Sequence, residues 1–173
     1  MATNPKEIAD RSFVAIKING KNYFGNPNET ILDVSKRNGI EIPHLCFKEG
    51  MRPDGNCRAC MVEIEGERVL QPSCVRTISD GMVVNTNNDR VIHSQKLVLE
   101  LLTSDVSDKI YKKDSELSDW AERLNIKANR FPTNVQEKHD LTHPAIAVNL
   151  DAWMHCTRCV RAGRGEPVKD VMG

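Results

Sequence analysis

The sequence predicts an α+β fold over residues 12–90, made of a small sheet and one short helix. Three observations predict it: an alternating apolar segment that ends in Asn-Gly, a short apolar stretch with helix-capping residues, and further short apolar runs beyond an irregular loop. Residues 1–11 are polar, and we expect them to form an N-terminal tail.

The first two strands are predicted on either side of Asn19-Gly20. Residues 12–18 (SFVAIKI) alternate apolar and polar side chains, as expected for a strand with one buried face. Asn-Gly is the strongest two-residue signal for a hairpin, so residues 21–24 are the expected return strand.

A short helix is predicted over residues 31–37. Thr30 is a suitable N-cap, and Asp33 three residues later completes a box-like N-terminus. Gly39 follows the helix at the position where a left-handed residue is favoured. The helix therefore has both a start and a stop signal.

Residues 42–59 form an irregular stretch rich in Pro, Gly and Cys, which we call the cysteine loop. Residues 60–65 (CMVEIE) after it are predicted as a strand, with Gly66 as the turn and residues 68–70 as the partner strand. Residues 82–85 are the last expected strand. The cysteine loop is too irregular to be held by packing alone, which indicates that a bound group holds it.

Residues 91–142 are predicted to be a connector of helical and irregular segments. Asn88 or Asp89 is the expected cap of a first helix, and a second, weakly amphipathic helix is expected around Trp120. Four apolar side chains are expected on one face of the first helix, with Ile92 and Leu99 beside them: Val91, Val98, Leu101 and Leu102.

The composition excludes several classes of function. With 24 basic and 24 acidic residues the net charge is zero, so no field attracts nucleic acid or an anionic membrane. No apolar run approaches the roughly 18 residues of a membrane span. The N-terminus MATNPKEIAD lacks a secretion signal. We therefore expect a cytoplasmic protein without a membrane span or a nucleic-acid partner.

The cysteines carry the main chemical signal. Six cysteines in a chain expected to be cytoplasmic indicate metal or redox chemistry before disulfides. Four of them have the spacing Cys46-x10-Cys57-x2-Cys60-x13-Cys74. Iron–sulfur clusters take four thiolates, and plant-type [2Fe–2S] proteins share the inner x2 pair and the late fourth cysteine.

The residues between these cysteines fit a cluster loop, although other readings of the spacing stay open. Gly55 allows a sharp turn, and backbone N–H groups from Gly55, Arg58 and Ala59 are expected to point at the sulfurs. A zinc site, two disulfides, and a thioredoxin-like redox pair of Cys57 and Cys60 are the alternatives. Zinc is disfavoured because the two outer cysteines are each isolated in the sequence. A thioredoxin-like redox pair is disfavoured because Cys57 and Cys60 do not lie between a strand and a helix.

Residues 42–74 (IPHLCFKEGMRPDGNCRACMVEIEGERVLQPSC) resemble the [2Fe–2S] domain of a known family. The family comprises the large peripheral-arm subunit of NADH dehydrogenase (complex I), the diaphorase subunit of NAD-reducing hydrogenase, and the alpha subunit of NAD-dependent formate dehydrogenase. Residues 94–105, 129–133 and 143–162 are most similar to the formate dehydrogenase branch.

The resemblance implies a ferredoxin-like β-grasp domain whose [2Fe–2S] ligands are Cys46, Cys57, Cys60 and Cys74. It implies electron transfer as the relay portion of an NAD-linked oxidoreductase, with flavin- or NAD-binding and other iron–sulfur subunits as partners. No catalytic site is expected within this chain, because the pterin centre of the resembled enzyme would lie beyond Gly173. A hydrogenase diaphorase subunit and a free-standing electron carrier are the alternative functions.

Residues 143–173 depart from the family and are interpreted as an incomplete, degenerate [4Fe–4S] segment. In the ferredoxin pattern C-x2-C-x2-C-x3-C, Trp153 and Gly163 replace the outer cysteines. Only Cys156 and Cys159 remain, as possible vestigial ligands, so a [4Fe–4S] cluster is not expected here. A truncated reading frame with a degraded end is one hypothesis for this pattern.

The family's cluster with one His and three Cys ligands is not expected either. No cysteine lies between Cys74 and Cys156, so the cluster lacks its local thiolates. His93, His139 and His143 are therefore interpreted as ordinary surface or packing residues.

Overall fold

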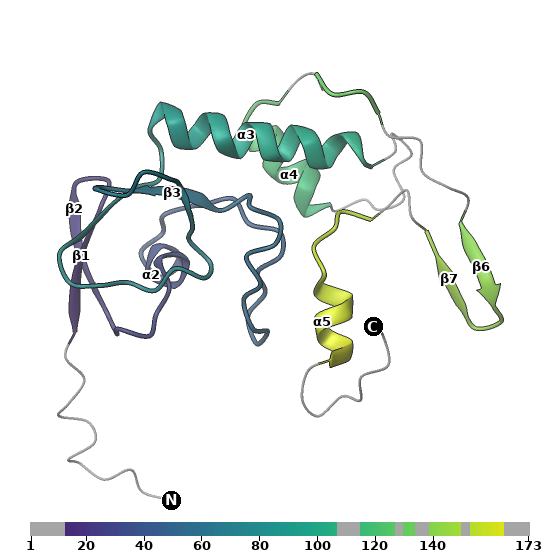
Figure 1. The fold of residues 1–173 in the computed structure, drawn as a ribbon, viewed down its shortest axis with the longest axis horizontal. Coiled ribbons are helices and arrows are strands. Elements are labelled where there is room, and N and C mark those ends of the chain that lie inside the picture. The colour runs from purple at the N-terminus through teal and green to yellow at the C-terminus, as the bar shows by residue number, and fades with distance from the viewer. Residues whose placement is uncertain (1–12, 107–114, 127–129, 134–138, 150–152, 165–173) are drawn as a thin grey trace, which may run out of the picture. The chain divides into compact units, whose positions relative to one another are not determined.

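The computed structural model describes residues 13–106, 115–126, 130–133, 139–149 and 153–164 (Figure 1). The chain divides into two compact units. The first comprises residues 1–42 and 60–92, and the second comprises residues 43–59 and 93–173. The expected tail of residues 1–11 lies outside the described residues.

The division differs from the boundary expected at residue 90. From Pro43 to Ala59 the cysteine loop belongs to the second unit, whereas the sequence places it with the strands of residues 12–90, which belong to the first. The physical reason is that side chains from the far end of the chain bind the loop backbone, as described below.

The first unit contains a mixed five-stranded sheet. Its strands are β1 (Val14–Ile18), β2 (Lys21–Gly25), β3 (Met61–Ile64), β4 (Gln71–Pro72) and β5 (Met82–Asn85). They lie in the order β2-β1-β5-β3-β4, with β1 and β5 parallel and the other neighbours antiparallel. The α+β prediction for this region agrees with the mixed sheet and its helix.

The predicted hairpin and helix are both confirmed. Asn19 and Gly20 have φ of 49° and 81°, the left-handed conformation that a two-residue turn between β1 and β2 requires. Helix α2 (Ile31–Arg37) begins with the expected capping box, because the Thr30 hydroxyl accepts from the Asp33 amide and the Asp33 carboxylate accepts from the Thr30 amide. Gly39 after it has φ of 70°.

The core of the first unit follows from alternation along the strands. Every second residue of β1, β3 and β5 is buried, and α2 adds its own buried apolar residues. The buried side chains are Val14, Ile16, Ile18, Ile31, Leu32, Val34, Val62, Ile64, Met82 and Val84.

One strand prediction was wrong. Residues 68–70 are not a strand; the partner of β3 is β4, with Met61 paired to Pro72 and Val62 to Gln71. The intervening segment is instead held by side chains, because Arg90 donates to the Arg68 carbonyl over 2.7 Å. Gly66 does turn the chain as expected, with φ of 85°.

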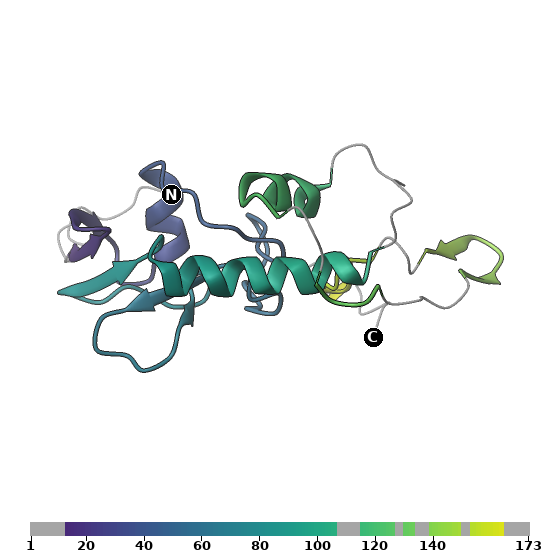
Figure 2. The same ribbon diagram turned by 90° about the horizontal axis from the view of Figure 1, so that it is seen from above.

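Helix α3 (Asp89–Ser104) is one unbroken helix (Figure 2), capped as predicted by Asn88, whose side-chain oxygen accepts from the Val91 amide over 3.0 Å. The buried residues of this helix only partly match its predicted apolar face. Leu101 is 52% exposed, while Val91, Leu99 and the polar Gln95 are buried. The 91-95-99 spacing of four residues follows one helix face. Val91 and Leu99 belong to the predicted apolar set, whereas Gln95 was missed because a glutamine does not count as apolar.

The second unit contains shorter elements. They are α4 (Glu116–Arg123), β6 (Asp140–His143), β7 (Ile146–Val148) and α5 (Arg158–Arg164). Helix α4 contains Trp120, as predicted, and β7 pairs antiparallel with β6. Within the described ranges, none of the helices combines the length and apolar character needed to cross a membrane.

Candidate metal centre

The cysteine loop has neither helix nor strand, and three left-handed residues shape it. Gly50, Gly55 and Arg58 have φ of 81°, 62° and 59°. Glycine adopts this conformation without strain, whereas a non-glycine residue pays for it and is typical of turns and functional sites. Arg58 lies between Cys57 and Cys60, so the strained turn falls inside the x2 spacing.

Cys46 and Cys57 are brought together within the second unit. Both are buried, and the Cys46 amide donates to the Cys57 Sγ over 3.4 Å. Hydrogen bonding with the Cys46 side chain, followed by burial, raises the pKa of the Cys57 thiol far above its ordinary range, while the Ala59 amide acts in the opposite direction. Two such thiols ionise together only beside a compensating positive charge, which iron supplies.

Cys60 and Cys74 lie in the first unit, at one end of the β3–β4 ladder. Both are fully buried. Met61, next to Cys60, pairs with Pro72, two residues before Cys74, and this pairing brings the two cysteines' segments side by side. The Ser73 amide also donates to the Cys60 carbonyl over 3.0 Å. The buried Ser73 hydroxyl has no hydrogen-bond partner among the described residues. A buried hydroxyl beside a thiol suits an acceptor such as cluster or cysteine sulfur.

The donor set therefore fits an iron–sulfur cluster. The four thiols are buried, and none of the six cysteines forms a disulfide. In the described ranges, no three His, Cys, Asp or Glu side chains are arranged to hold a single metal ion. A [2Fe–2S] cluster differs from such an ion, because each of its two irons takes only two protein ligands.

Residues 11–89 match the family described as "2Fe-2S iron-sulfur cluster binding domain". This region contains all four cysteines of the predicted ligand set. The match supports a [2Fe–2S] cluster in this region. The predicted [2Fe–2S] cofactor is thus confirmed at the level of the domain.

Longer similarities extend beyond the [2Fe–2S] domain. The chain is 32% identical to a subunit of the NADH-quinone oxidoreductase of Rhizobium meliloti (strain 1021), over 86% of this chain and 18% of that protein. It is 35% identical to NADP-reducing hydrogenase subunit HndD of Solidesulfovibrio fructosivorans, over 86% of this chain and 27% of that protein. The chain therefore spans about a fifth to a quarter of the length of these relatives.

A solved structure has a similar fold. It is that of an NAD+-reducing [NiFe]-hydrogenase in the H2-reduced state, with a TM-score of 0.82 and 25% sequence identity. The match covers 92% of this chain and 69% of that chain. The similarity thus includes the segment after the [2Fe–2S] domain.

The terminal cysteine pair lies in that segment. Cys156 is half-buried and Cys159 is exposed on α5. Trp153, at an outer position of the expected cluster motif, stacks on His155 with ring centroids 6.3 Å apart. Gly163, at the other outer position, is buried.

Sequence reasoning missed two arginines that bind the cysteine loop of the [2Fe–2S] domain. Arg158 and Arg161 of α5 donate to the carbonyl oxygens of Phe47 and Cys46, respectively. His44 on the same loop lies against Trp120 of α4, with ring centroids 6.0 Å apart. The three-residue spacing of the arginines on a helix was the available signal, because such residues share a face.

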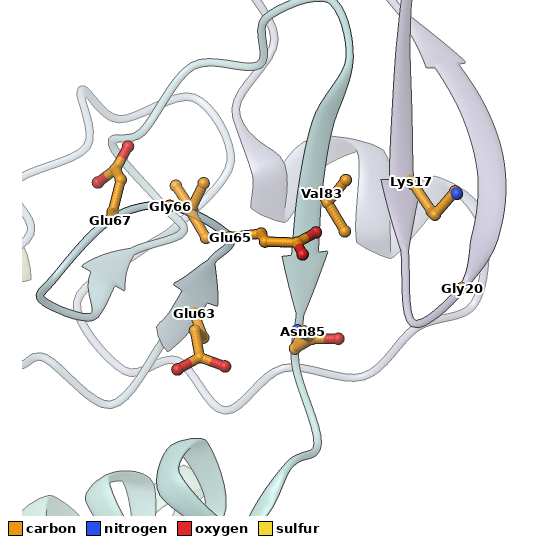
Figure 3. A pocket seen from close by; sticks show the side chains of 9 residues that line it. Lys17, Gly20, Glu63, Glu65, Gly66, Glu67, Val83 and Asn85 are labelled. Atoms are coloured by element: carbon orange, nitrogen blue, oxygen red, sulfur yellow. The ribbon is translucent and has the colours of Figure 1, made fainter.

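An acidic pocket of about 450 Å³ lies on the sheet of the [2Fe–2S] domain (Figure 3). Two of its glutamates have structural partners: Glu63 pairs with Arg90 over 2.8 Å and Glu67 with Arg76 over 2.7 Å. Hydrogen bonding from Arg90 lowers the pKa of Glu63. These two ion pairs hold the turn after β3 and give Glu63 and Glu67 a structural role.

Proposed function

We propose that this chain transfers single electrons through its [2Fe–2S] cluster, as the relay portion of an NAD-linked oxidoreductase. The observation that carries the proposal is the match of residues 11–89 to a cluster-binding domain, in a region that contains four buried cysteines free of disulfides. Plant-type clusters have potentials of roughly −400 mV, low enough to exchange electrons with nicotinamide or flavin. Burial of the thiols suits this, since a cluster shielded from water is protected from hydrolysis.

The proposed ligands are Cys46, Cys57, Cys60 and Cys74. The Cys57 Sγ already accepts from the Cys46 amide, and Ala59 adds a second backbone N–H. Such donors stabilise negative charge on a ligand sulfur and so raise the cluster potential. Gly55 and Arg58 are left-handed and turn the loop between Cys46 and Cys60.

Anaerobic purification of the full chain tests the ligand set. We expect two irons and two acid-labile sulfides per chain, and an EPR signal that appears only on reduction. Cys57→Ser is expected to lose or strongly alter the visible absorbance, whereas Cys159→Ser, the matched control on α5, leaves it unchanged. A colourless protein that contains zinc would refute the proposal and favour the zinc alternative.

The proposed complex is NAD-dependent formate dehydrogenase, with this chain at the front of its alpha subunit. Support comes from residues 94–105, 129–133 and 143–162, which resemble that branch in order and spacing. Flavin- or NAD-binding subunits and further iron–sulfur subunits are the proposed partners. Six cysteines without disulfides also support our proposal of a cytoplasmic location.

A hydrogenase diaphorase subunit is the second candidate. The NAD+-reducing [NiFe]-hydrogenase structure favours it, because that match covers 92% of this chain. Purification of the tagged chain from its native cells separates the two. Formate-dependent NAD+ reduction by the purified complex supports the first candidate, and hydrogen-dependent NAD+ reduction supports the second. The absence of both activities would favour a free-standing electron carrier.

We propose that Cys156 and Cys159 hold no [4Fe–4S] cluster in this chain. Two thiolates are half of what that cluster needs, and Trp153 and Gly163 supply no further donor. Iron analysis tests this directly: two irons per chain are expected, and six would overturn it.

A further inference from the structure

The side chain of Arg161 joins the C-terminal helix to the cysteine loop. Its guanidinium donates to the Cys46 carbonyl through one Nη and to the Arg52 carbonyl over 2.7 Å through the other. The side chain is only 13% exposed. Arg161 and all of these partners belong to the second unit. One cation thus holds the loop backbone at two positions, Cys46 and Arg52.

Two side chains hold the guanidinium in place. The Arg161 Nε donates to the Thr157 hydroxyl over 3.2 Å, and the Thr157 hydroxyl lies 2.9 Å from the Asp54 carboxylate. The same Asp54 oxygen is 3.9 Å from the Arg161 Nε. Thr157 belongs to the C-terminal segment and Asp54 to the loop, so the arginine is fixed from both sides. A fixed cation loses little conformational entropy when it binds, which makes its contacts effective.

The position of this charge has an electrostatic consequence. Reduction by one electron converts one ferric iron of a [2Fe–2S] cluster to ferrous, adds one negative charge, and changes no bond to the protein. A cation near a ligand favours the more negative state, and burial strengthens the interaction because water screens it less. Asp54 has the opposite sign, but its side chain is 34% exposed and is therefore screened more than Arg161.

We propose that Arg161 is a positioning residue for the [2Fe–2S] cluster, which fixes the loop at Cys46 and raises the reduction potential of the cluster. The inference rests on the proposed role of Cys46 as a ligand. Arg158 assists by binding the adjacent carbonyl, because its guanidinium donates to Phe47 over 2.9 Å and pairs with Glu116 of α4. The degenerate C-terminal segment thereby acquires a role that does not require a cluster of its own.

The test is a redox titration of the full chain, followed by EPR, with Arg161→Gln, Arg161→Lys and the surface control Lys21→Gln. Each variant is first assayed for two irons and two sulfides per chain. In Arg161→Gln, the ratio of reduced to oxidised cluster at the wild-type midpoint is expected to fall about tenfold, or about 59 mV for one electron. Arg161→Lys keeps the charge and is expected to fall between wild type and Arg161→Gln, while Lys21→Gln matches wild type.

Asp54→Asn provides a shift of opposite sign. The asparagine side chain still accepts from the Thr157 hydroxyl, but its negative charge is gone, so the midpoint potential is expected to rise. If the two variants only loosened the loop, there would be no reason for the midpoint potential to shift in opposite directions in Arg161→Gln and Asp54→Asn. A rise in one variant and a fall in the other therefore supports an electrostatic role.

Several results would overturn the inference. A full complement of iron in Arg161→Gln with an unchanged midpoint would show that the arginine does not tune the cluster. Loss of iron from both Arg161→Gln and Arg161→Lys would show a purely structural role, whereas loss from the glutamine variant alone supports positioning by charge. Failure of the underlying ligand assignment is seen separately, because Cys46→Ser would then retain wild-type iron, sulfide and absorbance.

Discussion

Asn19 and Thr86 exchange two hydrogen bonds across 67 residues of sequence. The Asn19 Nδ2 donates to the Thr86 hydroxyl over 2.7 Å, and the Thr86 amide donates to the Asn19 Oδ1 over 2.9 Å. The Asn19 amide also donates to the Val84 carbonyl over 2.9 Å. One turn residue therefore ties the β1–β2 hairpin to the end of β5.

Replacing this asparagine tests the tie. Asn19→Gly keeps a residue that accepts the left-handed φ of 49° but removes both side-chain hydrogen bonds. We expect the free energy of unfolding to fall by about 1–3 kcal/mol, since the part-buried Thr86 groups lose their partner. Urea denaturation of the full chain measures it. The exposed neighbour Asn22→Ala should be near wild type, and equal stabilities of Asn19→Gly and Asn22→Ala would contradict the prediction.

Gly25, at the end of β2, is required by close packing. A Cβ at this position would lie 2.7 Å from the Ile78 Cδ1, 2.8 Å from a Glu29 carboxylate oxygen and 2.9 Å from the Val34 Cγ2. Gly25→Ala is expected to reduce the free energy of unfolding by about 1–3 kcal/mol through overpacking. In the double variant with Val34→Ala, part of the clash is relieved, so the combined loss should be smaller than the sum of the single losses. Strict additivity would argue against the clash.

Local signals made the hairpin and α2 predictable, whereas pairing between distant segments did not follow from them. The Asn19-Gly20 turn and the Thr30–Asp33 capping box each involve at most four consecutive residues. The local sequence is therefore enough to predict the hairpin turn and the start of the helix. The partner of β3 is decided instead by which residues its edge can pair, and a proline within β4 disguised that strand.

The candidate site shows the same limit. Cysteine spacing indicated the cluster and its ligand set, because the ligands of such a cluster are cysteines at characteristic separations in the sequence. The bonds from Arg161 to the loop join positions more than 100 residues apart. Their acceptors are backbone carbonyls, which every residue has, so no residue type marked them in advance.

The capping box of α2 gives a third prediction. Thr30→Ala removes the acceptor of the Asp33 amide, which lies 3.2 Å away, and leaves that donor without its side-chain cap. A loss of about 0.5–2 kcal/mol in the free energy of unfolding is expected. Thr30→Ser keeps the hydroxyl and serves as the matched control, to be compared by thermal and urea denaturation. If alanine and serine behaved alike, the hydroxyl would have no capping role.

The last prediction concerns Glu29, which links the β2–α2 turn to the end of the helix. Its carboxylate pairs with Arg37 and accepts from the Asn26 amide over 2.7 Å. The Arg37 hydrogen bond is the largest cause that lowers the pKa of Glu29 below 4.5, and burial acts in the opposite direction. Arg37 in turn donates to the Phe24 carbonyl over 2.9 Å.

The sign of the pH dependence follows from the lowered pKa. Glu29 is stabilising at pH values above its unfolded pKa, and this contribution is lost as the pH falls through the folded value. Glu29→Gln is therefore expected to cost more at pH 7 than at pH 4, by less than about 1 kcal/mol because the Arg37 side chain is half exposed. The wild-type and variant chains are compared at each pH by urea denaturation, so that any acid effect on the cluster cancels. A cost that is equal at both pH values, or larger at pH 4, would show that the ion pair does not stabilise the folded chain.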